Sequence, residues 1–271
     1  MPILPKHPVE KSSEQEFHKL DYAIMRIAFD VHNQLGRFYD EKIYKNKLLD
    51  ACQKNGIEAE AEFEVELKHK DFSKSFFVDP LMNRRSVYEL KTIKAIQEPQ
   101  RIQTLDYLFM TDTNHGKIIN FRPPSVEHEF VSTSMNHQDR HAFKICEADW
   151  SEHSEKAAQM RILLADLLDD WGAFLNTTTY QEAICHFLGG GTNIVQPIEI
   201  RNGNTLLGHQ KTPILSKTET FCLTSIPKDL LTYKMHLLRF LSHTQLKFLY
   251  WINFNRFEVQ FTTLENKLFC P

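Results

Sequence analysis

Residues 75–93 have the sequence SFFVDPLMNRRSVYELKTI. Apolar and aromatic residues open this stretch and return near its end, and LMNRR between them is typical of a turn. The pattern predicts two short strands, one in the region 74–80 and one at 86–93. Asp79 ends the first strand, and Glu89 and Lys91 lie on the second.

Asp79, Glu89 and Lys91 form the pattern D-x9-E-x-K. Because side chains alternate along a strand, Glu89 and Lys91 point to the same face. Asp79 can bring a second carboxylate beside Glu89, and Mg²⁺ or Mn²⁺ prefers such oxygen ligands. Lys91 would orient or deprotonate a water molecule and offset charge on phosphorus. The pattern therefore predicts a metal-dependent phosphodiesterase site.

Further candidates lie outside this segment. Glu41 stands near the start of a predicted helix and adds a third carboxylate to the metal ligands. Gln103 and Tyr107 are four residues apart on another predicted helix, so they share a face and could position water or a backbone phosphate. Arg84 and Arg85 in the predicted turn could contact phosphates, although a solvated turn is the commoner explanation for such residues.

Each catalytic candidate also has an ordinary structural interpretation. The bare pattern D-x9-E-x-K arises often by chance, and a Glu and a Lys two apart on a strand are commonly an exposed pair. Glu41 fits the positive end of a helix, and Gln103 and Tyr107 fit a solvent residue and a core aromatic. His32, beside the apolar face of the first helix, is expected to be a packed histidine.

The surrounding sequence predicts an α/β fold with a mixed central sheet flanked by helices. Apolar spacing indicates helices at 21–35 and 40–54 and a third at 99–111. Residues 58–70, EAEAEFEVELKHK, alternate with a period of two and predict a strand with one wet face. HGKIINF at 115–121 is another predicted strand.

Composition narrows the classes of function. The 271 residues carry a net charge of −3, so any surface that binds nucleic acid must be local or metal-assisted. The five cysteines include no Cys-x-x-Cys pair, which argues against zinc or an iron–sulfur cluster. From the polar residues 1–17 we expect no secretion signal, and the sequence has no apolar run of 18 residues. We therefore predict a cytoplasmic protein that does not enter membranes.

The chain also contains an internal repeat. The block VYELKTI at 87–93 is similar to TFCLTSI at 220–226, and two further ungapped blocks occur in the same order. One of them pairs Gly36, Phe38 and Tyr44 with Gly172, Phe174 and Tyr180, and the other pairs Ile119, Asn120 and Phe121 with Ile252, Asn253 and Phe254. We expect a leader at 1–18, a first domain at 19–148 and a second at 149–271.

The two copies differ where their residues are ionisable. The apolar positions persist, whereas Glu41, Glu89, Lys91 and Gln103 are replaced by Thr177, Cys222, Thr224 and His236. This contrast predicts an active first copy and a catalytically inactive second copy. The second copy would pack on the first as an intramolecular pseudo-dimer or supply a nucleic-acid groove. Deleting it should leave a poorly folded or aggregation-prone first copy, and a homo-oligomer is a further expectation.

Five blocks between residues 20 and 145 resemble the GxxExxY proteins of the PD-(D/E)XK nuclease superfamily. They are VHNQLGRFYDEKIY, FFVDP, VYELKT, QTLDYL and GKIINF. The resemblance implies a restriction-endonuclease-like fold, duplicated in tandem here, with Glu41, Asp79, Glu89 and Lys91 as the site. Gln103 and Tyr107 resemble the Q-x-x-x-Y element of the exonuclease branch, which processes DNA ends.

Two positions depart from the family pattern. Phe38 stands where the family usually has glycine, and Pro80, which lacks a backbone donor, follows Asp79. With these departures, the sequence predicts Mg²⁺-dependent hydrolysis of DNA by the first domain. A non-catalytic scaffold that binds nucleic acid or protein, and a hydrolase of another phosphoester, are the alternatives.

Overall fold

The computed structural model describes residues 2–267. The chain forms two compact units that divide between Gln138 and Asp139. Each unit has its own sheets and its own hydrophobic core. Both are mixed α/β structures with helices against their sheets, so the predicted fold class is confirmed.

The first unit is built on a five-stranded sheet in the order β2-β5-β6-β7-β8. Strands β6 and β7 are parallel, and the other neighbours are antiparallel, which makes the sheet mixed. A separate antiparallel sheet has the order β1-β3-β4. The strands are β1 (Ile3–Pro5), β2 (Ala59–Glu60), β3 (Phe63–His69), β4 (Phe72–Val78), β5 (Leu81–Met82), β6 (Ser86–Lys91), β7 (His115–Asn120) and β8 (Glu127–Ser132).

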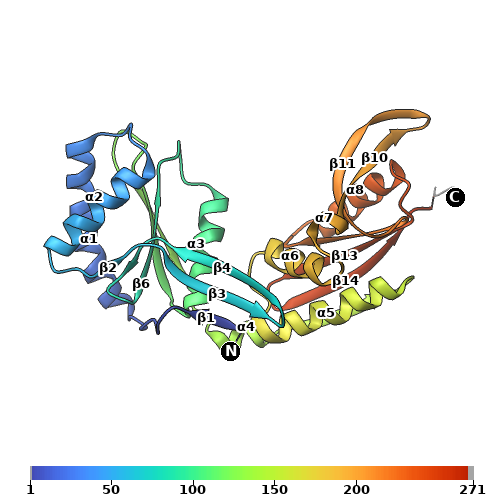
Figure 1. Cartoon of the computed structure of the whole chain (residues 1–271), viewed down its shortest axis with the longest axis horizontal. Helices are drawn as coiled ribbons and strands as arrows, with labels where there is room; N and C mark the ends of the chain where they lie inside the picture. The colour runs from blue at the N-terminus through green and yellow to red at the C-terminus, as the bar shows by residue number, and fades with distance from the viewer. Residues whose placement is uncertain (1, 268–271) are drawn as a thin grey trace. The chain divides into compact units, whose positions relative to one another are not determined.

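Three helices cover the two faces of the five-stranded sheet (Figure 1). Helices α1 (Glu14–Leu35) and α2 (Glu41–Lys54) pack on one face, where their apolar stripes meet Tyr88, Leu90 and Ile119. Helix α3 (Glu98–Thr111) packs on the opposite face, against β6, β7 and β8. Tyr88 and Leu90 therefore face the core of α1 and α2, and Glu89 between them faces the α3 side.

Local chemistry explains where these elements begin and end. Ser13 and Glu16 form a reciprocal capping box at the start of α1. Gly36 ends the helix with φ of 72°, a conformation that favours glycine. Strand β3 alternates buried and exposed residues along Phe63–His69, which confirms the period-two pattern.

Part of the predicted leader is ordered structure. Residues Ile3–Pro5 pair with β3, and α1 already begins at Glu14. The predicted turn after Pro80 likewise contains a short strand, because Leu81 and Met82 pair with Val87 and Ser86. These short pairings have no periodicity long enough to show in the sequence.

The second unit has one six-stranded sheet in the order β10-β11-β12-β13-β14-β9. Its strands are β9 (Lys144–Asp149), β10 (Val195–Asn202), β11 (Thr205–Ser216), β12 (Glu219–Thr224), β13 (Phe248–Asn255) and β14 (Glu258–Glu265). Because β9 pairs with β14, the expected boundary after residue 148 lies too late in the chain.

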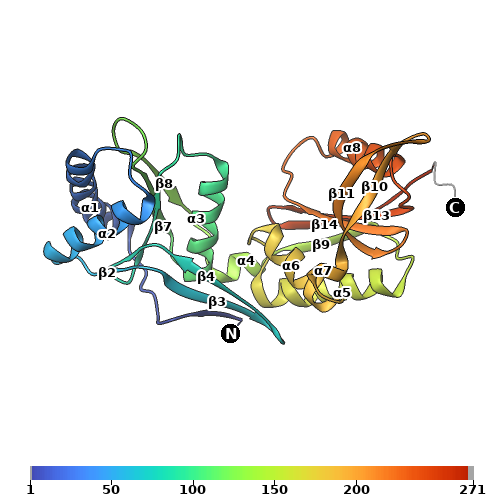
Figure 2. The ribbon, with the colours of Figure 1, turned by 45° about the horizontal axis from the view of Figure 1, so that its top comes forward.

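Helices also lie on both faces of this second sheet (Figure 2). Helix α8 (Leu230–Ser242) lies on one face, where Leu241 joins a core with Leu249 and Trp251. Helices α5 (Glu155–Trp171) and α6 (Thr177–Phe187) lie on the other. Two short helices, α4 (His137–His141) and α7 (Gly191–Ile194), complete the elements of this half.

The two units contain matching tyrosine contacts. The Tyr44 hydroxyl donates to the Gly36 carbonyl at 2.8 Å, and the Tyr180 hydroxyl donates to the Gly172 carbonyl at 2.5 Å. Tyr44 also stacks on Phe121, with ring centroids 4.8 Å apart. Tyr180 lies against Phe254 with a centroid distance of 5.0 Å.

The two units also contain matching asparagine contacts. Asn120 binds both the N–H and the carbonyl of Ile93, at 3.0 and 2.8 Å. Asn253 binds the same two groups of Ile226, at 2.8 and 3.0 Å. In each unit, this side chain therefore fixes the segment that follows the inner parallel strand to the neighbouring strand.

Candidate functional site

Strand β6 places Glu89 and Lys91 side by side. The Lys91 ammonium contacts Glu89 Oε1 directly, which shows that the two side chains share the face expected from strand alternation. The Glu89 side chain is 5% exposed and the Lys91 side chain 15%. The pair is therefore largely removed from water and is not the exposed surface pair of the ordinary interpretation.

The other carboxylate oxygen of Glu89 is buried without a hydrogen-bond partner. Burial raises the pKa of Glu89 to about 7, against the opposing effect of Lys91. The negative charges of Glu41 and Asp79 raise this pKa further, so both carboxylates lie within electrostatic reach of Glu89. The three predicted carboxylates therefore lie in the same region of the fold, within range of one another's charge.

Asp79 follows β4 and is held by partners that the sequence did not single out. Lys45 on α2 donates to Asp79 Oδ2 at 2.5 Å, and the Glu62 backbone N–H donates to Oδ1 at 3.4 Å. Burial lowers the pKa of Lys45, but the ion pairs with Asp79 and Glu62 outweigh this and leave it above its ordinary value. Lys45 lies four residues after Glu41 on one helix face, a spacing that could have indicated it.

Helix α3 contributes the pair Gln103 and Tyr107. The Gln103 amide donates to the Tyr107 hydroxyl at 2.9 Å, as four-residue helical spacing predicts. Burial raises the pKa of Tyr107 to about 12, and the charge of Glu89 adds to the effect. Tyr107 is thus both a buried residue of α3 and a neighbour of the Glu89 carboxylate.

Arg84 and Arg85 lie elsewhere. Both precede β6, whereas Lys91 ends it, so the length of the strand separates them from the carboxylates. Arg85 donates to Glu10 at 2.6 Å, and Arg84 lies 3.7 Å from Glu58. The structure therefore gives these arginines carboxylate partners and does not bring them together with Glu89.

His32 is a packed histidine, as expected. Its side chain is buried, its Nε2 lies 3.1 Å from the Pro123 carbonyl, and its ring stacks on Phe121. These contacts account for the residue structurally and give it no place at the carboxylates.

The carboxylates offer a divalent cation suitable oxygen ligands, but they are not grouped as a complete binding site. Across residues 2–267, no three His, Cys, Asp or Glu side chains are grouped closely enough to hold a metal ion. Lys45 and Lys91 instead neutralise Asp79 and Glu89. The free, buried oxygen of Glu89 is nevertheless a ligand atom without a partner, and hard cations prefer such oxygens.

The second unit has no equivalent charges at this place. Cys222 pairs with Trp251 in the sheet as Glu89 pairs with Ile118, and Thr224 pairs with Asn253 as Lys91 pairs with Asn120. The Thr224 hydroxyl donates to Asn253 Oδ1 at 2.8 Å and accepts from Trp251 Nε1 at 2.8 Å. These polar groups are therefore satisfied within the protein.

The strand pairing also identifies the counterpart of Asp79. Leu81 pairs with Val87 in the first unit, and Ile214 pairs with Thr220 in the second. Proline precedes both Leu81 and Ile214, and the residue before that proline is Asp79 in one unit and Thr212 in the other. Thr212 thus stands in the second sheet at the position that corresponds to Asp79, a match that the ungapped blocks did not include.

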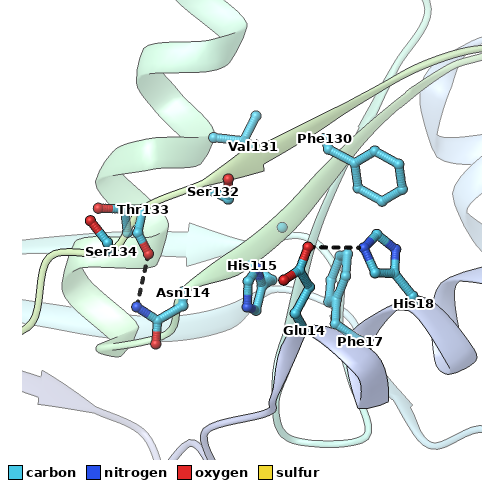
Figure 3. Close-up of a pocket in the computed structure, with 11 residues that line it drawn as sticks. Glu14, Phe17, His18, Asn114, His115, Phe130, Val131, Ser132, Thr133 and Ser134 are labelled. Carbon is cyan, nitrogen blue, oxygen red and sulfur yellow. Dashed lines mark hydrogen bonds and ion pairs between the residues drawn. The ribbon is translucent and has the colours of Figure 1, made fainter.

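A separate pocket of about 490 Å³ lies at the start of β7 (Figure 3). Phe17, His115 and Phe130 line it, and His18 beside them pairs with Glu14 at 3.6 Å. Because Lys91 pairs with Asn120 at the far end of β7, this pocket is not part of the carboxylate site.

The first unit is similar to a known family. Residues 18–132 match the family model of the PD-(D/E)XK nuclease superfamily. The match runs from within α1 to the end of β8 and includes Glu41, Asp79, Glu89 and Lys91. It indicates phosphodiester hydrolysis as the chemistry of the first unit and nucleic acid as its substrate. No curated protein matches the chain.

No helix formed by residues 2–267 has the length and apolar character needed to cross a bilayer.

Proposed function

We propose that the first unit is a divalent-metal-dependent nuclease that hydrolyses phosphodiester bonds of DNA. The observation that carries this proposal is the buried Glu89 carboxylate, which has one oxygen on Lys91 and the other without a partner. An ordinary structural ion pair would satisfy both oxygens, because an unsatisfied buried polar group is costly. The match of residues 18–132 supports the same chemistry.

In this proposal, Asp79 and Glu89 hold Mg²⁺ or Mn²⁺, and Glu41 adds a third carboxylate. A cation held there would polarise the phosphodiester. Lys91, as an ammonium, orients the attacking water and offsets the charge that develops on phosphorus. Gln103, held through Tyr107, positions the water or a neighbouring backbone phosphate.

Lys45 has a role that follows from its contact with Asp79. It balances the Asp79 charge in the metal-free protein, since its side chain is only 14% exposed and lies 2.5 Å from that carboxylate. Lys45 is thus a charge-balancing residue, and a cation that binds Asp79 has to displace it.

We also infer that the second unit is a degenerate copy of the first, and that the first is of the GxxExxY type. The matching contacts of Tyr44 and Tyr180, and of Asn120 and Asn253, support the duplication. Thr177, Thr212, Cys222 and Thr224 stand where the first unit has its charged residues. Hydroxyls and a thiol do not bind Mg²⁺ as carboxylates do, so the second unit is catalytically inactive.

Two smaller parts of the proposal concern location and assembly. A cytoplasmic location agrees with Cys52, Cys146, Cys185 and Cys222, which are free thiols. Association of the copies, either within one chain as a pseudo-dimer or between chains, is expected from the internal repeat. Measuring the mass of the intact protein in solution tests whether separate chains associate.

The decisive experiment measures cleavage of end-labelled single- and double-stranded DNA with Mg²⁺, Mn²⁺ or EDTA. We expect metal-dependent cleavage by the wild type and none by Glu89→Gln, because the amide keeps the shape but loses the charge. Glu64→Gln changes an exposed glutamate of β3 and serves as the matched control. Calorimetric titration with Mn²⁺ should show the same loss of binding in Glu89→Gln alone.

The same experiment decides the alternative of a non-catalytic scaffold. That alternative is favoured by one observation, namely that lysines already neutralise Asp79 and Glu89. Metal-independent DNA binding without cleavage by the wild type would support the scaffold. Full cleavage by Glu89→Gln would remove this carboxylate from the mechanism, and it would place activity elsewhere in the chain.

A further inference from the structure

A basic pocket of about 440 Å³ lies in the first unit at the end of the parallel strands. Its lining contains three cations and no acidic side chain: Arg37, Thr92, Lys94, Arg122, Pro123 and Pro124. This is a marked local excess of positive charge in a chain whose net charge is −3. Such an excess can hold an anion that the protein as a whole would repel.

Three of the residues that line the pocket are close in sequence to residues of the candidate site or to their strand partners. Thr92 directly follows Lys91, so their Cα atoms are about 3.8 Å apart. Arg122 comes shortly after Asn120, which pairs with Lys91 across the sheet. Arg37 lies in the short loop before α2, the helix that begins with Glu41. The residues that line the pocket are therefore close along the backbone to those of the carboxylate site.

Arg122 holds the walls of this pocket together without losing its charge. Its guanidinium donates to the carbonyls of Thr92, Arg37 and Tyr39, at 3.3, 3.0 and 3.2 Å. These partners are neutral, so the positive charge is oriented but not balanced by a carboxylate.

The other two cations are also uncompensated. Within residues 2–267, neither Arg37 nor Lys94 forms an ion pair with an acidic side chain, and the only ring contact of Arg37 is with Phe38, 5.2 Å away. By contrast, Arg84, Arg85 and Arg101 all have glutamate partners. Cations grouped without acids in one pocket are suited to an external anion.

The second unit has lost all three cations. The positions equivalent to Arg37, Lys94 and Arg122 are occupied by Ala173, Pro227 and Asn255. Each equivalence follows from the preceding residue, which is matched in the two units: Gly36 with Gly172, Ile93 with Ile226, and Phe121 with Phe254. The corner is also covered there, since Ala173 is 3% exposed and donates its N–H to the Arg140 carbonyl at 3.0 Å. The basic pocket is thus present only in the unit that has the carboxylates.

We propose that Arg37, Lys94 and Arg122 bind a backbone phosphate of DNA next to the bond that is cleaved. The proposal rests on the proposed nuclease function, and it assigns to that site a surface for the substrate beyond the carboxylates. The pocket contacts phosphate and not base edges, so it strengthens binding without choosing a sequence. It also supplies the local positive charge that binding of DNA to an acidic protein requires.

The test measures binding of fluorescein-labelled duplex and single-stranded DNA in EDTA, over a range of salt concentrations. The main variant is Arg37→Gln with Lys94→Gln, because these side chains make no hydrogen bonds that the fold needs. We expect weaker binding to every sequence tested. The plot of log affinity against log salt should become shallower by about one unit per residue. Arg122→Gln is a second variant, checked for folding by circular dichroism.

Arg26→Gln and Lys228→Gln are the matched controls. Arg26 is an exposed cation of α1, and Lys228 lies in the loop of the second unit that corresponds to the Lys94 loop. Both should keep the wild-type salt slope. If the Arg37→Gln, Lys94→Gln protein has the wild-type salt slope and affinity, the pocket does not bind DNA phosphate, even if the wild type cleaves DNA. If that protein binds DNA more weakly and the wild type does not cleave DNA, the pocket binds phosphate but the proposed nuclease function is wrong.

Discussion

At the scale of residues, the environment of each carboxylate decides whether it can bind a cation. Glu89 has one buried oxygen without a partner, whereas both oxygens of Asp79 accept hydrogen bonds. Lys45 is therefore a competitor for any cation that binds Asp79. This competition gives the site a property that can be measured without observing cleavage.

Lys45→Gln should bind Mn²⁺ more tightly than the wild type. In the variant, Mn²⁺ no longer has to break the partly exposed Lys45–Asp79 ion pair, which is worth on the order of 1 kcal/mol. The dissociation constant for Mn²⁺ should therefore fall roughly fivefold. Calorimetric titration measures the change, with Lys54→Gln at the far end of α2 as the control. Equal or weaker affinity in Lys45→Gln would show that Lys45 does not compete for Asp79.

A second buried ion pair belongs to the core and not to the site. Lys117 is 1% exposed and donates to Asp21 at 2.6 Å, and the Tyr88 hydroxyl donates to the other oxygen of Asp21 at 3.2 Å. Lys117→Met would leave Asp21 buried with a charge and only Tyr88 as partner. We expect a loss of about 3–5 kcal/mol in the free energy of unfolding.

Denaturant unfolding of Lys117→Met tests this expectation. Adding Asp21→Leu to the same protein should recover most of the loss, because the uncompensated charge is then gone. A Lys117→Met protein as stable as the wild type would show that the first unit does not depend on this ion pair.

At the scale of elements, each unit depends on one asparagine that fastens the segment after the inner parallel strand. Asn120 and Asn253 are both buried and bind the N–H and carbonyl of Ile93 and Ile226. In the first unit, the fastened segment connects β6, with Glu89 and Lys91, to α3, with Gln103 and Tyr107. The asparagine therefore helps fix two walls of the site relative to each other.

Asn120→Ala and Asn253→Ala should each destabilise the protein by about 1–3 kcal/mol, because buried backbone groups lose their partners. Only Asn120→Ala should also slow DNA cleavage, since only the first unit has the carboxylates. Thermal unfolding and cleavage rates of the two variants distinguish these effects. Equal loss of cleavage in both would contradict an inactive second unit.

At the scale of the whole molecule, each unit has a core made from its own residues. In the first unit that core joins α1 and α2 to β6 and β7, and in the second it joins α8 to β13 and β14. The first unit therefore does not need the second to complete its core. If the second unit is a structural or substrate-holding partner, it should affect solubility and DNA binding more than the fold of the first unit.

Removing residues 139–271 tests this hypothesis. We expect the remaining protein to unfold cooperatively, since its core is intact, but to aggregate or to bind DNA more weakly than the whole chain. Light scattering and the DNA-binding assay measure the two effects. A soluble monomer as active as the full chain would show that the second unit is not a required partner.

The sequence by itself determined the α/β class, the face shared by Glu89 and Lys91, and the pairing of Gln103 with Tyr107. These features depend on the periods of strands and helices, which neighbouring residues set locally. The proposed repeat rests on the same kind of pattern, because similar apolar spacing occurs in both halves. His32 was likewise correctly expected to be packed, from its place beside an apolar helical face.

Only the tertiary structure decided which charges meet. Lys45 binds Asp79 from a different helix, Lys117 is buried on Asp21, and Arg84 and Arg85 lie at the wrong end of β6. It also showed that Arg37, Lys94 and Arg122 line one pocket, although they come from three separate loops. Electrostatic interactions depend on distance in space and on burial. Neither quantity can be obtained from spacing along the chain when the partners are tens of residues apart.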